Sequence, residues 1–169
     1  MSMNFNNVEE FVAARQQFFE SHPEAPEAKD IECLNLIMKK EFAEQIIAGT
    51  KKLEFRAYSN HYVSRLIDKD VSAYIQRHIN DDKVITFCND IRQVKMIHFH
   101  NYENSWILDV ECDFNDVFCI NKQDIDFLHE KYNCHDFDDD LARFEAMKAE
   151  QRPYIFYFVC GKIIKRVGI

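Results

Sequence analysis

The sequence has no apolar stretch that could cross a membrane. No run approaches the ~20 consecutive apolar residues that a transmembrane helix needs. Residues Met1 to Asn7 show no signal-peptide character. We therefore expect a cytoplasmic protein without a membrane partner.

The cysteines lack the spacing of a metal or redox motif. No Cys-x-x-Cys pair occurs, so the sequence indicates neither a zinc ribbon nor a redox site. We interpret the cysteines as free, buried thiols in a reducing cytoplasm, and we expect no metal and no cofactor. They are Cys33, Cys88, Cys112, Cys119, Cys134 and Cys160.

Positive charge is also in short supply. The chain has 21 Lys and Arg against 29 Asp and Glu, a net charge of −8. A protein that coats nucleic acid without selection needs many contacts from Lys and Arg to phosphate, so this balance argues against one. Residues 39–56 nevertheless hold five basic and three acidic residues, whereas residues 121–150 hold four basic and nine acidic. A basic mouth on an acidic body fits a small ligand or a short single strand better than a duplex.

Aromatic residues, by contrast, are abundant. With 15 Phe and 7 Tyr we expect a well-filled core. A chain of 169 residues is long enough to bury roughly 70% of its unfolded surface. Asn7 and Glu10 form a capping-box pattern that begins a helix ending near Ser21. Residues 22–30 contain two prolines and are interpreted as a linker. The chain is thus divided into an N-terminal helix and linker, 1–30, and a main domain, 31–169.

The main domain mixes short strands and helices without regular β-α alternation, which favours an α+β fold. Alternating residues predict a hairpin of strands 94–100 and 106–112, and the apolar run 154–159 predicts a central strand. Gly161 is expected to mark a bulge or turn before another strand. The remaining expected elements are strands at 33–38, 83–88 and 163–167, and helices at 41–48, 61–67, 71–78, 122–132 and 138–147.

The run from Gly49 to Arg56 is the most informative segment. Gly49 follows the expected 41–48 helix, where a left-handed C-terminal cap is favoured. Alternation along a following strand turns two cations and one carboxylate to the same outer face, where an anionic ligand could be held. Lys51 has the opposite parity and must lie on the turn to join them. The outward residues are Lys52, Glu54 and Arg56.

This segment resembles the ASCH family of the PUA-like superfamily. The family signature Gly-x-Lys-x-x-Glu-x-Arg is matched at all four positions, and the resemblance extends from about residue 34 to residue 56. It implies a small PUA-like β-barrel with flanking helices, here with an N-terminal helical appendage. The matching residues are Gly49, Lys51, Glu54 and Arg56.

The resemblance also implies a module that binds single-stranded RNA, a nucleotide or a modified nucleoside. Lys51 and Arg56 would contact phosphate or base oxygens, with Lys52 beside them, and Glu54 would accept from an exocyclic amine. Tyr58 or Tyr62 could stack on a base, although both are equally suited to a core. The number of subunits is left open.

Other functions stay open. Some ASCH proteins resemble small amidohydrolases that deacetylate acetylcytidine, which would make Lys51 and Glu54 catalytic, although Glu54 stands where those enzymes have Thr. Ribonuclease activity is also associated with the family, but no His pair here is spaced for it. A protein-interaction role would use the acidic segment 121–150. The simplest alternative is that Lys51 is solvated and Glu54 forms an ion pair that only orders the strand.

Four further groups are interpreted as structural. His98 and His100 share a strand face and fit cross-strand packing better than a metal, while Cys134, His135 and Asp136 are adjacent and seldom converge on one ion. Asp109 and Glu111 are expected on a solvated face. The acidic run 138–140 suits the N-terminus of a helix.

Overall fold

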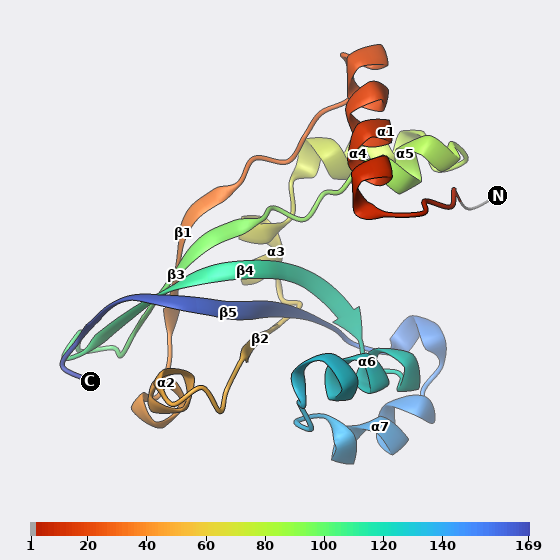
Figure 1. Ribbon diagram of the computed structural model, residues 1–169. Coiled ribbons are helices and arrows are strands. Elements are labelled where there is room, and N and C mark those ends of the chain that lie inside the picture. The colour runs from red at the N-terminus through yellow and green to blue at the C-terminus, as the bar shows by residue number, and fades with distance from the viewer. Residues whose placement is uncertain (1–2) are drawn as a thin grey trace. The chain divides into compact units, whose positions relative to one another are not determined.

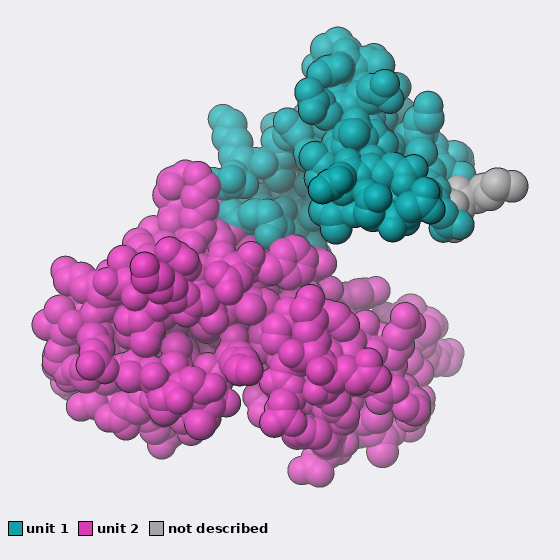
Figure 2. Space-filling view, in the orientation of Figure 1, with its two compact units in different colours: residues 1–30, 63–93 teal, residues 31–62, 94–169 magenta. Residues whose placement is uncertain are grey.

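The computed structural model describes residues 3–169 and divides the chain into two compact units (Figures 1 and 2). Unit 1 contains residues 1–30 and 63–93, and unit 2 contains residues 31–62 and 94–169. The division expected at residue 30 coincides with one of these boundaries, but residues 63–93 join the N-terminal segment. Met1 and Ser2 lie outside the described residues. They belong to the expected first domain and to the N-terminal segment in which the sequence shows no signal-peptide character.

Unit 1 is helical. It contains α1 (Val8–Ser21), α4 (Lys69–Arg77) and α5 (Asp82–Phe87). The Asn7 side chain accepts from the Glu10 amide at 2.8 Å, which begins α1 as the sequence predicts. The apolar faces of the helices meet in one core formed by Phe18, Ala25, Val71, Tyr74, Val84, Phe87 and Cys88.

The prediction of a strand at 83–88 is wrong, because residues 82–87 form the helix α5. The Asp81 side chain accepts from the Lys83 amide at 2.9 Å and caps the helix. Val84 and Phe87, three residues apart, are buried, while Ile85 between them is 48% exposed. This spacing belongs to one face of a helix rather than to a strand.

Unit 2 contains a five-stranded mixed sheet in the order β1-β3-β4-β5-β2. The parallel pair β1–β3 is followed by antiparallel pairs, and buried side chains such as Phe99, Phe156 and Phe158 fill the core. The strands are β1 (Ile31–Ile37), β2 (Leu53–Ala57), β3 (Val94–His100), β4 (Ile107–Cys119) and β5 (Tyr154–Val167). The helices are α2 (Lys40–Ile47), α3 (Asn60–Leu66, which continues into unit 1), α6 (Lys122–Tyr132), α7 (Asp138–Glu145) and the 3-10 turn Ala149–Gln151.

The α+β class is confirmed, but a closed barrel is not seen. Within residues 3–169 the sheet is open, with β1 and β2 at its edges. The Arg56 guanidinium on β2 donates to the Ile37 carbonyl at the end of β1 at 3.0 Å. A side chain, rather than a ladder of backbone hydrogen bonds, therefore links the two edges.

The two longest strands form a bent ribbon (Figure 1). The strands expected at 154–159 and 163–167 form one continuous strand, β5, and the register with β4 shifts at three places between Asp109 and Phe114. Gly161 lies at this irregularity as predicted. A Cβ there would stand 2.2 Å from the Asp113 carboxylate, so any side chain at this position requires Asp113 to move.

Among residues 3–169, every helix is too short or too polar to span a bilayer. The six cysteines are free, but they are not uniformly buried. Cys33 is exposed, Cys88 and Cys112 are buried, and the other three are partly buried. The expectation of buried thiols is therefore wrong for Cys33, which lies on edge strand β1.

Candidate functional site

The turn between α2 and β2 places Lys51. Gly49 ends the helix at a φ of 76°, and the amides of Thr50 and Lys51 both donate to the Gln45 carbonyl, at 3.0 and 3.1 Å. Lys51 therefore lies on the turn immediately before β2, the position that the sequence requires for it to join Glu54 and Arg56.

Glu54 joins two cations. Its Oε1 lies 2.8 Å from Arg56 Nη2, and its Oε2 lies 3.3 Å from Lys51 Nζ. Glu54 is 8% exposed, so the outward orientation that alternation predicts for it does not leave it open to solvent. Because a buried carboxylate is costly without compensation, the two cations are what make this position tolerable.

Arg56 is held on several sides. Besides Glu54 and the Ile37 carbonyl, its Nη1 donates to the Tyr62 hydroxyl at 3.4 Å. Its Nε is buried and has no hydrogen-bond partner among the described residues. An unpaired buried donor costs about 1–3 kcal/mol, so stability alone does not account for the full arrangement of this side chain.

Two cavities flank this group. The first, of about 300 Å³, is bordered by Lys51 and Lys52 on one side and by residues 132–136 on the other. Phe42 contributes an aromatic wall and lies 5.7 Å from Lys51 Nζ. Lys52 is exposed and lines the same cavity. We call this the lysine pocket.

The second cavity, of about 600 Å³, contains Arg56 and Tyr58. Tyr58 stacks on Phe156 at 5.0 Å between ring centroids and remains 45% exposed. The structure therefore separates the expected ligand-binding residues into two cavities, with Glu54 connecting the cation of one to the cation of the other. We call the second cavity the arginine pocket.

Two residues of the arginine pocket are not predicted from the sequence. Arg143 and Arg152 line it together with Arg56. Like Arg56, Arg152 has a buried Nε without a hydrogen-bond partner among the described residues. Arg143 belongs to the strongly acidic segment 121–150 and Arg152 follows it closely, so the local composition does not indicate a basic site. No local sequence pattern pairs either residue with Arg56.

His98 packs across strands, as predicted. His98 faces Asp109 on β4, with Nδ1 2.5 Å from Oδ1, and this contact involves one imidazole and one carboxylate. The Asp109 side chain is only 14% exposed, so its expected solvated position is wrong. The pair ties β3 to β4.

Comparisons with known proteins gave one structural likeness to describe. No family model and no curated protein matches the chain. Its structure is similar to the crystal structure of a mutant of ZmASCH from Zymomonas mobilis, with a TM-score of 0.42 and 12% sequence identity over 82% of this chain and 75% of that chain. ZmASCH bears the name of the family that the Gly49–Arg56 segment resembles.

Proposed function

We propose that unit 2 is an ASCH-type, PUA-like module that binds a short single-stranded RNA or a nucleoside along the face formed by Lys51, Glu54 and Arg56. The observation that carries the proposal is the convergence of two cations on one buried carboxylate, at 2.8 and 3.3 Å, between two cavities. The match to the ASCH signature supports the same assignment.

Glu54 acts mainly as an anchor in this proposal. It is too buried to be the main contact for a ligand, but its two oxygens hold the Lys51 and Arg56 side chains in place. An ammonium has three donors and a guanidinium has five, so each retains donors for phosphate or base oxygens after its contact with Glu54. An exocyclic amine could still reach the carboxylate edge beside Lys51.

The cavities suit different parts of the ligand. The lysine pocket is at the lower end of the size range of small-molecule sites and has an aromatic wall, as a single nucleoside requires. The arginine pocket offers three guanidinium groups and two tyrosines, Tyr58 and Tyr154, which suits a phosphate and a stacked base. A mononucleotide would occupy one cavity, whereas a short strand would extend over both.

The test is calorimetric titration of a mononucleotide and of a short single-stranded RNA against variants of the two cations. Arg56→Ala should weaken binding of the RNA by ~1–3 kcal/mol, the usual loss for a charge-assisted hydrogen bond. Lys51→Ala should weaken the binding of both the mononucleotide and the RNA. Arg166→Ala is the matched control, because it removes the same charge from an exposed position on β5.

Wild-type protein that binds neither ligand, or affinities that are equal for wild type and both pocket variants, would contradict the proposal. Arg56→Lys separates charge from geometry, since it retains the cation but loses the planar fork that contacts Glu54, Ile37 and Tyr62. We expect its RNA affinity to fall between those of wild type and Arg56→Ala.

A second candidate function is hydrolysis of an acetylated cytidine. The contact between Lys51 Nζ and Glu54 Oε2, 3.3 Å long at the wall of the lysine pocket, favours it, because it places a proton donor beside a carboxylate at a ligand-sized cavity. Lys51→Met should abolish turnover of acetylcytidine while Lys52→Met, in the same pocket, retains it. Chromatography of products over about pH 6–9 is the measurement, and a wild type without turnover would leave binding as the function.

A further inference from the structure

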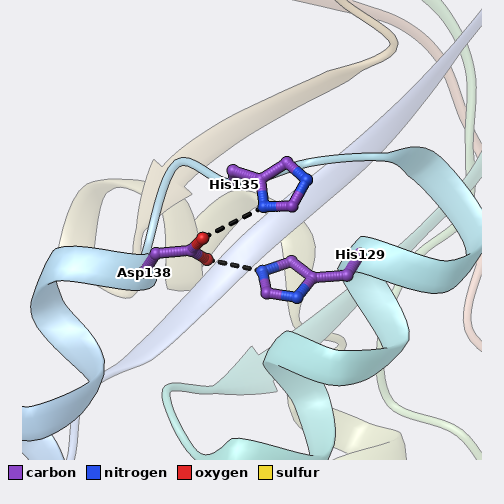
Figure 3. Close-up of side chains that lie close together, drawn as sticks. All are labelled: His129, His135 and Asp138. Carbon is purple, nitrogen blue, oxygen red and sulfur yellow. Dashed lines mark hydrogen bonds and ion pairs between the residues drawn. The ribbon is translucent and has the colours of Figure 1, made fainter.

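Two histidines and one aspartate converge where α6 turns into α7 (Figure 3). Asp138 lies between the two rings, with its Oδ1 2.5 Å from His129 Nε2 and its Oδ2 3.0 Å from His135 Nδ1. One potential ligand atom from each of the three residues lies within 4.8 Å of the others. The imidazoles are stacked with their centroids 4.3 Å apart.

Local structure produces this convergence. Asn133 ends α6 in the left-handed conformation, with a φ of 50°, and the Cys134 amide donates back to the Leu128 carbonyl at 3.2 Å. The chain then reverses, so that His135 in the link faces His129 on the last turn of α6. Asp138, the first residue of α7, is brought to both rings.

His135 also has the outer contact that metal-binding histidines use. Asn133 Oδ1 lies 3.3 Å from His135 Nε2, the ring nitrogen that faces away from Asp138. A polar partner on the second nitrogen fixes the orientation of the ring and the location of its proton. The Asp138 carboxylate accepts from both imidazoles, one on each oxygen.

An ordinary ion pair is the alternative, and the chain contains an example of it. His98 and Asp109 are equally close, at 2.5 Å, but no third group of metal-binding type meets them among the described residues. At His129, His135 and Asp138, by contrast, two imidazoles point their nitrogens at one carboxylate. A metal ion could replace the shared protons with small movements of the exposed side chains.

We propose that His129, His135 and Asp138 bind a divalent transition-metal ion of the zinc type. Imidazole nitrogen with one carboxylate oxygen suits Zn²⁺, Co²⁺ or Ni²⁺, whereas Mg²⁺ and Ca²⁺ prefer ligand sets made of oxygen. Three protein ligands leave a fourth tetrahedral position for water or another small donor. No local sequence pattern marks this site, because its ligands are six and three residues apart across a helix end.

The bound metal would fasten one wall of the lysine pocket. Residues 133–136, which include the ligand His135, line that pocket together with Lys51. The next residue, Phe137, packs edge-on against Phe55 of β2 with ring centroids 4.8 Å apart. Metal binding and the order of this wall are therefore expected to be coupled, although the metal site does not depend on the function proposed for Lys51.

The experiment uses the full chain after treatment with a chelator. Zn²⁺ is titrated by calorimetry in competition with a chromophoric chelator, and thermal unfolding is followed with Zn²⁺ and with Mg²⁺. We expect one Zn²⁺ per chain and a higher Tm with Zn²⁺ only, because a ligand that binds only the folded state stabilises it. His135→Gln should weaken Zn²⁺ binding by at least about tenfold.

His98→Gln is the matched control, since it removes a histidine from a contact with a single carboxylate and should leave Zn²⁺ affinity unchanged. His135 is exposed, so His135→Gln should keep the Tm of the metal-free protein, which separates loss of a ligand from loss of folding. Absence of saturable binding to wild type would overturn the proposal. Equal affinity of His135→Gln and wild type would do the same, and a thiolate-to-metal charge-transfer band with Co²⁺ would then assign the metal to cysteines.

Discussion

Glu54 shows how a single residue organises the motif face. Its carboxylate is nearly inaccessible to solvent, and each of its oxygens forms an ion pair with one cation. Both partner side chains are themselves less than a fifth exposed, at 16% for Lys51 and 18% for Arg56. Contacts of this kind are less screened by salt than surface ion pairs, so they hold the two cations in place more firmly than surface pairs would.

The thiols provide a prediction at the scale of residues. Burial raises the pKa of Cys112 to about 11 and that of Cys160 to about 12, with the nearby Glu54 carboxylate contributing to the latter. A raised pKa reduces the reactive thiolate, to ~10⁻⁴ of Cys160 at about pH 8. Iodoacetamide should therefore label Cys33, which is exposed, well before these two residues in the folded protein.

Mass spectrometry of timed digests measures the labelling, and the protein in denaturant is the control, where all cysteines should react at similar rates. Raising the pH toward the folded-state pKa should accelerate labelling of Cys112 before that of Cys160. Rapid labelling of Cys160 in the folded protein near neutral pH would show that β5 opens at this position.

At the scale of elements, the link between α6 and α7 is held to the sheet by one aromatic residue. Phe137 meets Phe55 at 4.8 Å and Phe118 at 5.3 Å, both edge-on. Phe137→Ala should lower the free energy of unfolding by about 1–3 kcal/mol, as expected for a partly buried aromatic residue. Urea denaturation measures the change.

Phe127→Ala is the control for that substitution. Phe127 is on α6, is 41% exposed and has Tyr132 as its aromatic partner. We expect it to cost less than half as much as Phe137→Ala. Equal costs for the two variants would mean that the α6–α7 link is not fastened to β2.

The elements that the sequence located correctly are those with strong local signals. The helix 122–132 has the bounds expected for it, because Asn121 accepts from the Asp124 amide at one end and Asn133 takes a left-handed conformation at the other. Helix α5 was mistaken for a strand because its six residues, many of them β-branched or aromatic, give little periodicity to read. Strands β4 and β5 are longer than predicted because their bulges interrupt the alternation on which the prediction relied.

At the scale of the whole molecule, the chain builds each unit from separated segments. Residues 63–93 interrupt the segments that form the sheet and pack with residues 1–30 instead. Within unit 1, Phe18 of α1 meets Phe87 of α5 at 5.5 Å between ring centroids. Contacts so distant along the chain leave no mark on local patterns, which is why the sequence suggested a simple N-terminal appendage.

The sequence by itself determined the α+β class, the Gly49 turn and the presence of Lys51, Glu54 and Arg56 on one short segment, because caps and alternation act between near neighbours. Only the tertiary structure decided that Glu54 is buried and that Arg143 and Arg152 join Arg56 in one pocket. It also decided that His129, His135 and Asp138 meet. Burial and convergence depend on which distant elements pack together, and the free energy of that packing belongs to the whole core rather than to any local run of residues.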